Sequence, residues 1–499
     1  DILVQNRCKK YVWSSDVTKL YNQLHLEDQS LPYGLFLFND ELNPDKPPDV
    51  YVMVVAWYGV SSTGNQANAA LIKLASELQD EFPLVKKIIE NDMFVDDAFP
   101  GSNCKQEREE QIKQTRECLA RGGFKLKYVV RSGEKPDPDV VDEKGRLKVL
   151  GYYWYPESDE MSPGFEEINF NKKRKGAKKP NPFPVTTEED VDRLMEPMRL
   201  TKRMVASKLA EIYDPLGMLE AYKVQWKLEY QSLTPFGWDQ LLPQELDAHF
   251  KERCKELLHL PDVKWPRCVI PSTAKDPGKV RLLGVADAAE SSAGAAIYAG
   301  YELMDGTYEC SLLNAKSRMV SKTIPRNELE GVMMLAEMMS KLKSGLEHVL
   351  IEEHYFTDST IAMCWCSNMT LKLKMYVRSR VAEIRRNMLG AKFRDLSEET
   401  PLHHINGILN PADLLTKQSQ VSPERLTPDH RWFKGEQWMR VPSAELPGTS
   451  FADLVLSSTQ KAELSQEFFK EPIITNGEEE GTDDTGYVNA LSFWPPRED

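Results

Sequence analysis

The sequence predicts a mixed α/β (α+β) protein of several domains, and three observations support this prediction. Its 499 residues correspond to about three domains of ordinary size. Two stretches, residues 1–135 and 278–420, alternate between strand-like and helix-like segments. The stretch between them, residues 186–260, has mostly helical periodicity. We therefore expect two sheet-containing parts that are joined by a helical connection.

Composition narrows the class of protein. Hydrophobic residues make up 41% and charged residues 28%, which is an ordinary balance for a soluble globular chain. No stretch approaches 18 uninterrupted apolar residues, so we expect no membrane span and no membrane partner. The eight cysteines form no CxxC pair, which indicates reduced thiols in an intracellular protein. The first residues, DILVQNRCKK, lack the pattern of a signal peptide, so we expect a processed product or a fragment.

The net charge of −14 argues against a uniformly basic nucleic-acid-binding protein. This charge is unevenly distributed, because residues 471–499 hold eight acids and one base. That acidic tail, which we expect to be disordered, accounts for half of the net charge. The body of the chain is only mildly acidic and can hold a local basic groove.

The first region is expected to contain strands at residues 11–13, 50–57 and 124–130, with helices at 68–84 and 106–121. The first strand ends in Ser-Ser-Asp, which places Asp16 at its end. Residues 93–99 (MFVDDAF) place apolar residues on both sides of Asp96 and Asp97. This pattern predicts a β-hairpin that carries both carboxylates at its tip, and a solvated Asp-Asp turn without a bound cation is the alternative. Adjacent carboxylates repel each other, and a divalent cation such as Mg²⁺ relieves the repulsion.

The middle region begins with a basic run, residues 171–180 (NKKRKGAKKP), which we interpret as a solvated loop or linker, with nuclear targeting or phosphate binding as the alternative. Helices are expected at residues 188–195, 202–213 and 219–230. The sequence Asp214-Pro215-Leu216-Gly217 is expected to be a turn that separates the last two helices. Five basic residues of these helices either contact a phosphate backbone or form a solvated face: Lys202, Arg203, Lys208, Lys223 and Lys227.

The second region is expected to contain, in chain order, three strands, a helix, a strand, a helix, a strand and a helix. Four acids fall at the ends or starts of these elements: Asp287, Glu328, Asp358 and Asp413. Each acid alone is also explained by a turn or by the helix dipole. Their joint order favours a shared site, because two Mg²⁺ ions held close together require several oxygen ligands. His403 and His404 lie in a predicted strand, where a structural role is favoured over a role in product release. A further helix is expected from Ser450.

The first region resembles the palm of a reverse transcriptase. In that family an aspartate ends a strand, and an aromatic residue five positions later excludes a 2′-hydroxyl. The resemblance implies these roles for Asp16 and Tyr21, and it implies that Asp96 and Asp97 complete the catalytic carboxylates. Residues 57–68 (WYGVSSTGNQAN) resemble the segment that contacts template and nucleotide, except that Thr-Gly replaces the usual Ser-Pro. This segment supplies the implied substrate-binding residues Tyr58, Gly59 and Gln66.

Residues 276–420 resemble a ribonuclease H domain, in which four carboxylates converge. Four other segments together resemble the BEL/Pao family of LTR retrotransposons: residues 81–83 (EFP), 149–154 (VLGYYW), 213–217 (YDPLG) and 323–329 (TIPRNEL). The similarity extends from residue 1 to about residue 440. It implies a reverse transcriptase–ribonuclease H segment of a retrotransposon polyprotein, which acts on an RNA template, RNA–DNA hybrids and dNTPs and contacts other parts of the same polyprotein. Mg²⁺ or Mn²⁺ is the implied cofactor.

The resemblance implies five parts. These are a palm at residues 1–154 that lacks the upstream fingers, a thumb or connection at 155–275, a ribonuclease H-like domain at 276–420, a C-terminal extension at 421–470 and the acidic tail at 471–499. The implied location is a cytoplasmic virus-like particle or the nucleus. An Asp-Thr-Gly sequence at residues 484–486 matches a peptidase signature but lacks the apolar strands that such a site needs. The alternative function is a catalytically incomplete or co-opted chain that binds nucleic acid or protein without turnover.

Overall fold

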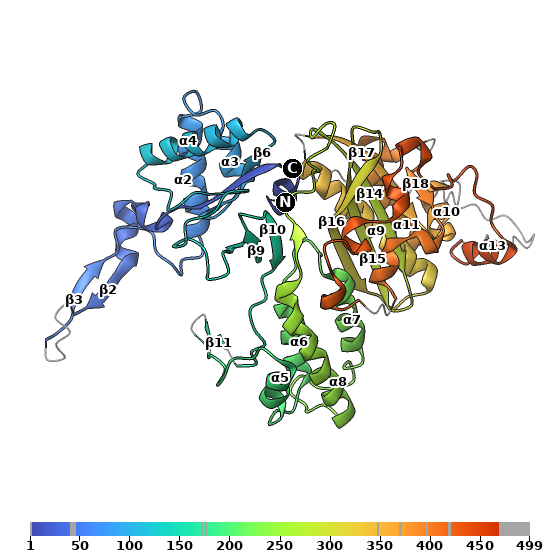
Figure 1. The fold of residues 1–499 in the computed structure, drawn as a ribbon, viewed down its shortest axis with the longest axis horizontal. Helices are drawn as coiled ribbons and strands as arrows, with labels where there is room; N and C mark the ends of the chain where they lie inside the picture. The colour runs from blue at the N-terminus through green and yellow to red at the C-terminus, as the bar shows by residue number, and fades with distance from the viewer. Residues whose placement is uncertain are drawn as a thin grey trace, which may run out of the picture. The chain divides into compact units, whose positions relative to one another are not determined.

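The computed structural model describes residues 2–39, 46–171, 173–174, 177–346, 349–368, 372–395, 398–417 and 421–468. These residues form two compact units (Figure 1). Unit 1 comprises Asp1–Met161 and Pro266–Ile270, and unit 2 comprises Ser162–Trp265 and Pro271–Asp499. The acidic tail and its Asp-Thr-Gly sequence lie outside the described residues. No helix among the described residues is long and apolar enough to cross a membrane.

The sheet of unit 1 is built around β1 (Tyr11–Asp16), which continues three residues beyond the predicted strand. Three short strands pair antiparallel with β1: β5 (Asp97–Ala98), β6 (Gly101–Ser102) and β7 (Val130–Arg131). A further strand, β4 (Met93–Phe94), pairs with β5 and completes the predicted hairpin. The strand predicted at 124–130 shrinks to β7, and only an isolated bridge joins Leu126 to Val17.

Helices α2 (Thr63–Glu77), α3 (Val85–Asn91) and α4 (Lys105–Arg121) enclose the core of unit 1 with β1. Trp13 of β1 is fully buried in this core, beside Ala67, Leu71 and Leu119. The predicted bounds of the helix at 68–84 are wrong at both ends. The helix begins earlier, at Thr63, and Pro83 lies in the break before α3, since proline cannot continue a helix interior.

Several shorter elements also belong to unit 1 or lie at its boundaries. Helix α1 (Ile2–Arg7) precedes β1, and β8 (Leu147–Val149) pairs with β9 (Tyr152–Tyr155). The strand predicted at 50–57 is reduced to β3 (Asp49–Val52), which pairs with β2 (Leu35–Phe38) in a ribbon whose side chains are exposed. The strands β10 (Glu160–Pro163) and β13 (Trp265–Pro266) contain the boundaries between the units.

Unit 2 begins with helices α5 (Glu188–Met195), α6 (Lys202–Glu211), α7 (Glu220–Gln231) and α8 (Gln244–Lys255). The first three match the predicted helices within two residues, and α8 was not predicted. The described part of the basic run forms two paired strands, β11 (Lys173–Arg174) and β12 (Ala177–Lys178), instead of the expected loop. The predicted turn at 214–217 is confirmed, because both Asp214 carboxylate oxygens accept backbone N–H groups and Gly217 has a φ of 74°.

A five-stranded sheet forms the centre of unit 2, in the order β16-β15-β14-β17-β18. Its strands are β14 (Lys279–Ala288), β15 (Ser292–Glu302), β16 (Tyr308–Met319), β17 (Leu350–Thr357) and β18 (Leu402–His404). The first three pair antiparallel, whereas β17 runs parallel to β14 and β18 runs parallel to β17. This is the predicted strand content of the second region.

Helices cover both faces of this sheet. Helix α9 (Ile324–Gly345) lies on one face, where Leu335 packs against Gly284. On the other face the turn at Gly217 contacts Ala315, and Leu415 packs against Gly294. Helices α10 (Thr360–Ser367), α11 (Met375–Leu389), α12 (Arg431–Lys434) and α13 (Ser458–Ser465) complete the unit. The helix expected from Ser450 is thus α13, which begins eight residues later.

The helices at residues 188–255 share one compact unit with the five-stranded sheet. The five predicted parts of the chain stay a prediction. Hydrogen bonds join these helices to other segments of unit 2. The Nζ of Lys227 on α7 donates to the Glu220 carboxylate and lies 3.1 Å from the Ser317 carbonyl oxygen of β16. The indole of Trp432 donates to the Met218 carbonyl at 2.8 Å.

Candidate functional site

Three of the four predicted carboxylates of unit 2 converge. Asp287 lies near the end of β14, and Asp358 follows directly after the adjacent parallel strand β17. Asp413 lies in a 3₁₀ helix, Pro411–Leu415. One carboxylate oxygen of each residue lies within 4.8 Å of the others. Because parallel strands end at the same edge of a sheet, two distant aspartates meet here, and the 3₁₀ helix brings the third.

Asn410 and Thr416 hold Asp413 against the sheet. The Asn410 side-chain amide donates to the Ala286 carbonyl oxygen at 2.9 Å, and its oxygen accepts from the Ala412 N–H at 3.1 Å. The Thr416 hydroxyl donates to the Asp287 carboxylate. The helix predicted from Asn410 is therefore only a short 3₁₀ helix. It is followed by Thr416, whose hydroxyl donates to Asp287. Both contacts place Asp413 beside β14.

The surroundings of Asp358 are closely packed. Nε2 of His404 lies 3.1 Å from the Asp358 carbonyl oxygen. A Cβ at Gly407 would lie 3.0 Å from a carboxylate oxygen of Asp358, so a larger residue at this position would crowd that carboxylate. His403 belongs to the sheet packing, since its ring lies 6.0 Å from the ring of Phe356. The described contacts thus favour the structural role expected for His403 and bring His404 next to Asp358.

Glu328, the fourth predicted carboxylate, lies beside the three aspartates and not among them. It is the fifth residue of α9, and its carboxylate accepts from the Ser359 hydroxyl. Asn327 is fully buried and fixes the start of α9, because its amide donates to the carbonyl oxygens of Ala289 and Glu290 at 2.9 and 3.1 Å. These contacts hold Glu328 against Ser359, which lies two residues after the end of β17.

Burial and mutual repulsion make these carboxyl groups weak acids. Burial, followed by the charge of Asp358, raises the pKa of Asp287 to about 8. Burial also raises the pKa of Asp358, with the Asp413 charge adding to the shift, and it raises the pKa of Glu328 to about 7. Protons and cations therefore compete for the same oxygens at this site.

The chemistry of the site fits a divalent cation. The Oδ1 atom of Asp413 is buried and has no hydrogen-bond partner among the described residues, whereas Oδ2 lies 2.6 Å from the Lys417 Nζ. A buried carboxylate oxygen without a donor is costly unless a cation satisfies it. Hard oxygen ligands in this number are those that Mg²⁺ or Mn²⁺ prefers. Asp287, Asp358 and Asp413 would hold the ion, with Glu328 adjacent.

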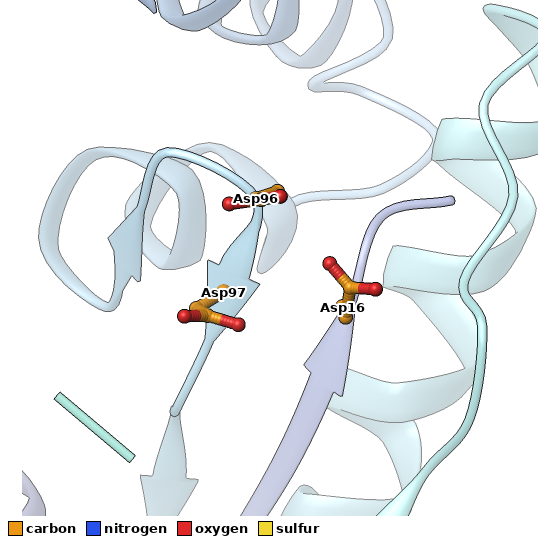
Figure 2. Close-up of side chains that lie close together, drawn as sticks. All are labelled: Asp16, Asp96 and Asp97. Carbon is orange, nitrogen blue, oxygen red and sulfur yellow. The ribbon is translucent and has the colours of Figure 1, made fainter. Parts of the chain in front are cut away.

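The predicted carboxylates of unit 1 also converge (Figure 2). Asp16 ends β1, and Asp97 is its register partner on β5. Asp96 lies in the connection between β4 and β5, at the tip of the hairpin. One carboxylate oxygen from each of the three residues lies within 4.8 Å of the others. The prediction of a hairpin that carries both adjacent aspartates is confirmed.

The hairpin tip contains a strained residue. Val95 has a φ of 60°, in the left-handed region that a β-branched residue rarely adopts. The strain costs about 1–2 kcal/mol for an ordinary residue. It is maintained by the pairing of β4 with β5 and of β5 with β1. A strained turn that presents a carboxylate is typical of a functional position.

Repulsion also weakens the acids of this cluster. Burial, together with the charges of Asp96 and then Asp16, raises the pKa of Asp97 to about 6. Burial and Asp96 raise the pKa of Asp16, against the lowering effect of Lys127, whose Nζ lies 3.7 Å from an Asp16 carboxylate oxygen. Lys127, whose side chain is exposed, is a cation that lies beside this cluster. Three carboxylates in this space can hold a divalent cation.

The predicted substrate-binding residues of unit 1 are only partly brought together. The rings of Tyr21 and Tyr58 lie 5.0 Å apart at a tilt of 58°, and Tyr58 is 73% exposed. A Cβ at Gly64 would lie 3.5 Å from the Tyr21 hydroxyl. Gly59 has a φ of 98° and open space around it, and Gln66 is exposed on the first turn of α2. The two tyrosines thus form an aromatic surface that faces the start of α2.

Three of the five basic residues expected to contact phosphates bind other groups of the protein instead. Lys208 is 2% exposed and donates to the Glu211 carboxylate at 2.6 Å, and Lys227 bonds Glu220 and β16. Arg203 forms a bidentate ion pair with Asp239 at 2.7 and 2.9 Å. Lys208 is buried and contacts Asn169 and Glu211, so it matches neither the expected phosphate contact nor the expected solvated face. Lys227 is partly exposed, and its Nζ bonds Glu220 and Ser317.

Sequence reasoning did not identify four residues of the unit 2 site: Ser359, Asn410, Thr416 and Lys417. Each lies within four residues of a predicted aspartate and is the kind of residue that donates to a carboxylate or caps a helix. The proximity of Thr416 and Lys417 to Asp413 was a usable signal. Their partners across the sheet were not visible in the sequence.

Comparison with known proteins addresses unit 2. A family model described as the Pao retrotransposon-like RNaseH-like domain matches residues 201–359. The match contains Asp287, Glu328 and Asp358, whereas Asp413 and the unit 1 cluster lie outside it. No curated protein matches the chain. The match supports a nucleic-acid-related function in a retrotransposon. The predicted relation to BEL/Pao retrotransposons is thus confirmed in its ribonuclease H part: residues 201–359 are similar to the RNaseH-like domain of Pao retrotransposons.

Proposed function

We propose that unit 2 is a ribonuclease H that hydrolyses the RNA strand of RNA–DNA hybrids. The observation that carries this proposal is the convergence of Asp287, Asp358 and Asp413 at one edge of the five-stranded sheet. The family match over residues 201–359 supports it. A hybrid duplex would be recognised by its shape and backbone, because its deep, narrow major groove does not admit side chains.

The residues of the site have separable roles in this proposal. Asp287, Asp358 and Asp413 would hold one or two divalent cations, which when bound supply an activated water and stabilise the leaving 3′ oxygen. Thr416 orients the Asp287 carboxylate by donating to it, and Asn410 fixes the 3₁₀ helix that carries Asp413. Ser359 orients Glu328 in the same way. Lys417 supplies a positive charge beside Asp413 at the exposed side of the site.

The test of this function is cleavage of a labelled RNA strand in an RNA–DNA hybrid, with and without Mg²⁺. Wild-type protein is compared with Asp358→Asn and with the control Asp305→Asn, which removes a fully exposed carboxylate from a turn of the same sheet. We expect Mg²⁺-dependent cleavage by wild type and control, and a loss on the order of 10³-fold or more in Asp358→Asn. Absence of cleavage by folded wild-type protein would favour the alternative, a chain that binds without turnover.

A second function is proposed for unit 1, RNA-directed DNA synthesis from dNTPs. The convergence of Asp16, Asp96 and Asp97 supports it, as does the aromatic pair Tyr21 and Tyr58 near the start of α2. The three carboxylates would hold the divalent cations that assist phosphoryl transfer. Primer extension on an RNA template tests this function in the full chain. Asp97→Asn is expected to abolish extension, whereas Asp80→Asn, an exposed aspartate after α2, is expected to leave it unchanged.

A further inference from the structure

A short segment near the end of the described chain lies against the ribonuclease H-like site of unit 2. We call Ser457–Phe468 the C-terminal strap. It contains α13, which contacts α10 at the edge of the unit (Figure 1). The Gln460 side-chain amide donates to the Thr360 hydroxyl at 2.9 Å, two residues beyond Asp358. Glu463 is close enough to Glu328 for its charge to add to the effect of burial in raising the pKa of Glu328.

The end of the strap neutralises an arginine beside the same site. Arg326 lies two residues before Glu328 on α9, and its Nε and Nη2 donate to the two carboxylate oxygens of Glu467 at 2.8 and 2.9 Å. Glu467 is held there by its backbone, because its carbonyl oxygen accepts from the Lys374 N–H at 2.8 Å. A fork of this kind is also the geometry in which arginine binds a phosphate group.

Arg326 belongs to a surface with an excess of positive charge. The Tyr376 ring has three cations around it: the Arg380 guanidinium at 3.7 Å, and Lys322 Nζ and the Arg326 guanidinium each at 4.9 Å. Glu330 also belongs to this cluster, where it is already bound by Arg380 at 2.6 Å and by the Tyr376 hydroxyl. Without Glu467, three cations would be balanced by one carboxylate. Such a cluster attracts a polyanion, and its attraction is weakened by salt.

The strap itself is weakly attached. None of the eight residues of α13 is buried. Among the described residues, the strap is attached by polar contacts at Gln460, Gln466 and the buried Glu467, and by a strand-like bridge from Phe468 to Leu373. A segment with little buried apolar surface opens at a low free-energy cost. The strap is therefore suited to displacement by a ligand that competes for Arg326.

We propose that Arg326 binds a backbone phosphate of the RNA–DNA hybrid, and that Glu467 occupies this phosphate site in the free protein, so that the C-terminal strap is an internal competitor of the substrate. This inference rests on the proposed ribonuclease H function. It adds a substrate-binding residue, Arg326, and a segment of the protein that competes with the hybrid for that residue. The hybrid must displace Glu467 before its backbone can reach Arg326, and the strap then leaves the region beside Glu328 and Thr360.

The experiment measures binding of a fluorescent RNA–DNA hybrid to the full chain in an Asp358→Asn background, so that no turnover interferes. Glu467→Gln is expected to lower the Kd by about 3- to 10-fold, the effect of one competing ion pair. Arg326→Ala is expected to raise the Kd and to reduce the slope of log Kd against log salt concentration by about one. In the Arg326→Ala background, Glu467→Gln should have no effect, because the two residues act on one contact.

The control is Glu436→Gln, which removes the same charge from an arginine pair elsewhere in unit 2, where Arg431 lies 3.0 Å away. Its Kd should equal that of the background protein. Hydrogen exchange provides a second measurement without a variant at the contact: amides of residues 462–468 should exchange faster when hybrid is bound. An unchanged or higher Kd for Glu467→Gln, or greater protection of the strap in the complex, would overturn the inference even if wild-type protein cleaves the hybrid. No hybrid binding by any of these proteins would instead overturn the proposed function.

Discussion

Asp287 and Asp358 each follow one residue after a register pair, Ala286 and Thr357, of the adjacent parallel strands β14 and β17. The two aspartates are separated by 71 positions in the chain, yet the sheet places their carboxylates together with that of Asp413. Repulsion between these carboxylates destabilises the folded protein when no metal is bound. A bound cation would remove this repulsion, because it would be attracted to all three carboxylates.

Asp287→Asn should stabilise the metal-free protein while removing its response to cations. The substitution removes a buried charge that repels Asp358, so the melting temperature in EDTA at pH 8 should rise by about 2–4 °C. Wild-type protein should gain thermal stability on addition of Mg²⁺ or Mn²⁺, and the variant should gain much less. Differential scanning fluorimetry measures both effects. A lower melting temperature in EDTA would contradict the prediction, and Asp305→Asn is the control.

Stability in the absence of metal should depend on pH with a definite sign. The pKa values of Asp287 and Glu328 are raised to about 8 and about 7, above those of the unfolded chain near 4. Between about pH 4 and pH 8 the folded state therefore binds more protons than the unfolded state, and these groups make unfolding easier as the pH rises. Their contribution should disappear in an Asp287→Asn, Glu328→Gln double variant. Melting in EDTA across this range measures the difference between the two proteins.

Cleavage at limiting Mg²⁺ should respond to pH in the opposite direction. Protons leave Asp287 as the pH rises toward 8, so the carboxylate becomes available to the cation and the rate should increase. Thr416→Val removes the hydroxyl whose hydrogen bond lowers the pKa of Asp287. We expect the rate profile of this variant to move to higher pH, with a loss of about 10-fold at pH 7. A uniform loss at every pH would contradict this positioning role.

Tyr21 should determine which sugar unit 1 accepts, if the proposed polymerase is active. Its ring lies against that of Tyr58, and its hydroxyl faces Gly64. Tyr21→Ala should open space beside the nucleotide, so incorporation of ribonucleotides relative to deoxyribonucleotides should rise by about 10-fold or more. Single-nucleotide extension with each substrate gives the ratio. Tyr33→Ala is the control, because that side chain is 86% exposed.

Gly217 should be essential for the packing of the helical segment on the sheet. A Cβ at this position would lie 1.8 Å from the Ala315 carbonyl oxygen, and the φ of 74° is itself unfavourable for alanine. We expect Gly217→Ala to destabilise unit 2 by about 2–4 kcal/mol. Gly306→Ala separates the two effects, because Gly306 has a φ of 84° but nothing within 4 Å. Equal destabilisation in denaturant titrations would show that the contact with Ala315 contributes nothing.

Much of the local structure was predictable because it depends on neighbouring residues. The succession of strands and helices along the second region, the helices near residues 188–230 and the hairpin at Asp96 and Asp97 follow from apolar periodicity, caps and turn residues. The wrong predictions concern segments whose structure depends on tertiary contacts. Strand-like residues 50–57 yield only a short exposed strand, and the helix expected after Asn410 stops because Thr416 bonds Asp287.

The sequence by itself determined which acidic residues fall at the ends of strands, in the hairpin and at the starts of helices, and so it determined the seven candidate carboxylates. Tertiary structure alone decided which of them meet, since convergence depends on strand register and on the packing of distant segments. It brought Asp413 to Asp287 and Asp358, placed Glu328 beside them in contact with Ser359, and buried Lys208 inside unit 2. It also brought Glu467 to Arg326 across 141 positions. Local propensity acts over a few residues, whereas these contacts form only when burial brings remote parts of the chain together.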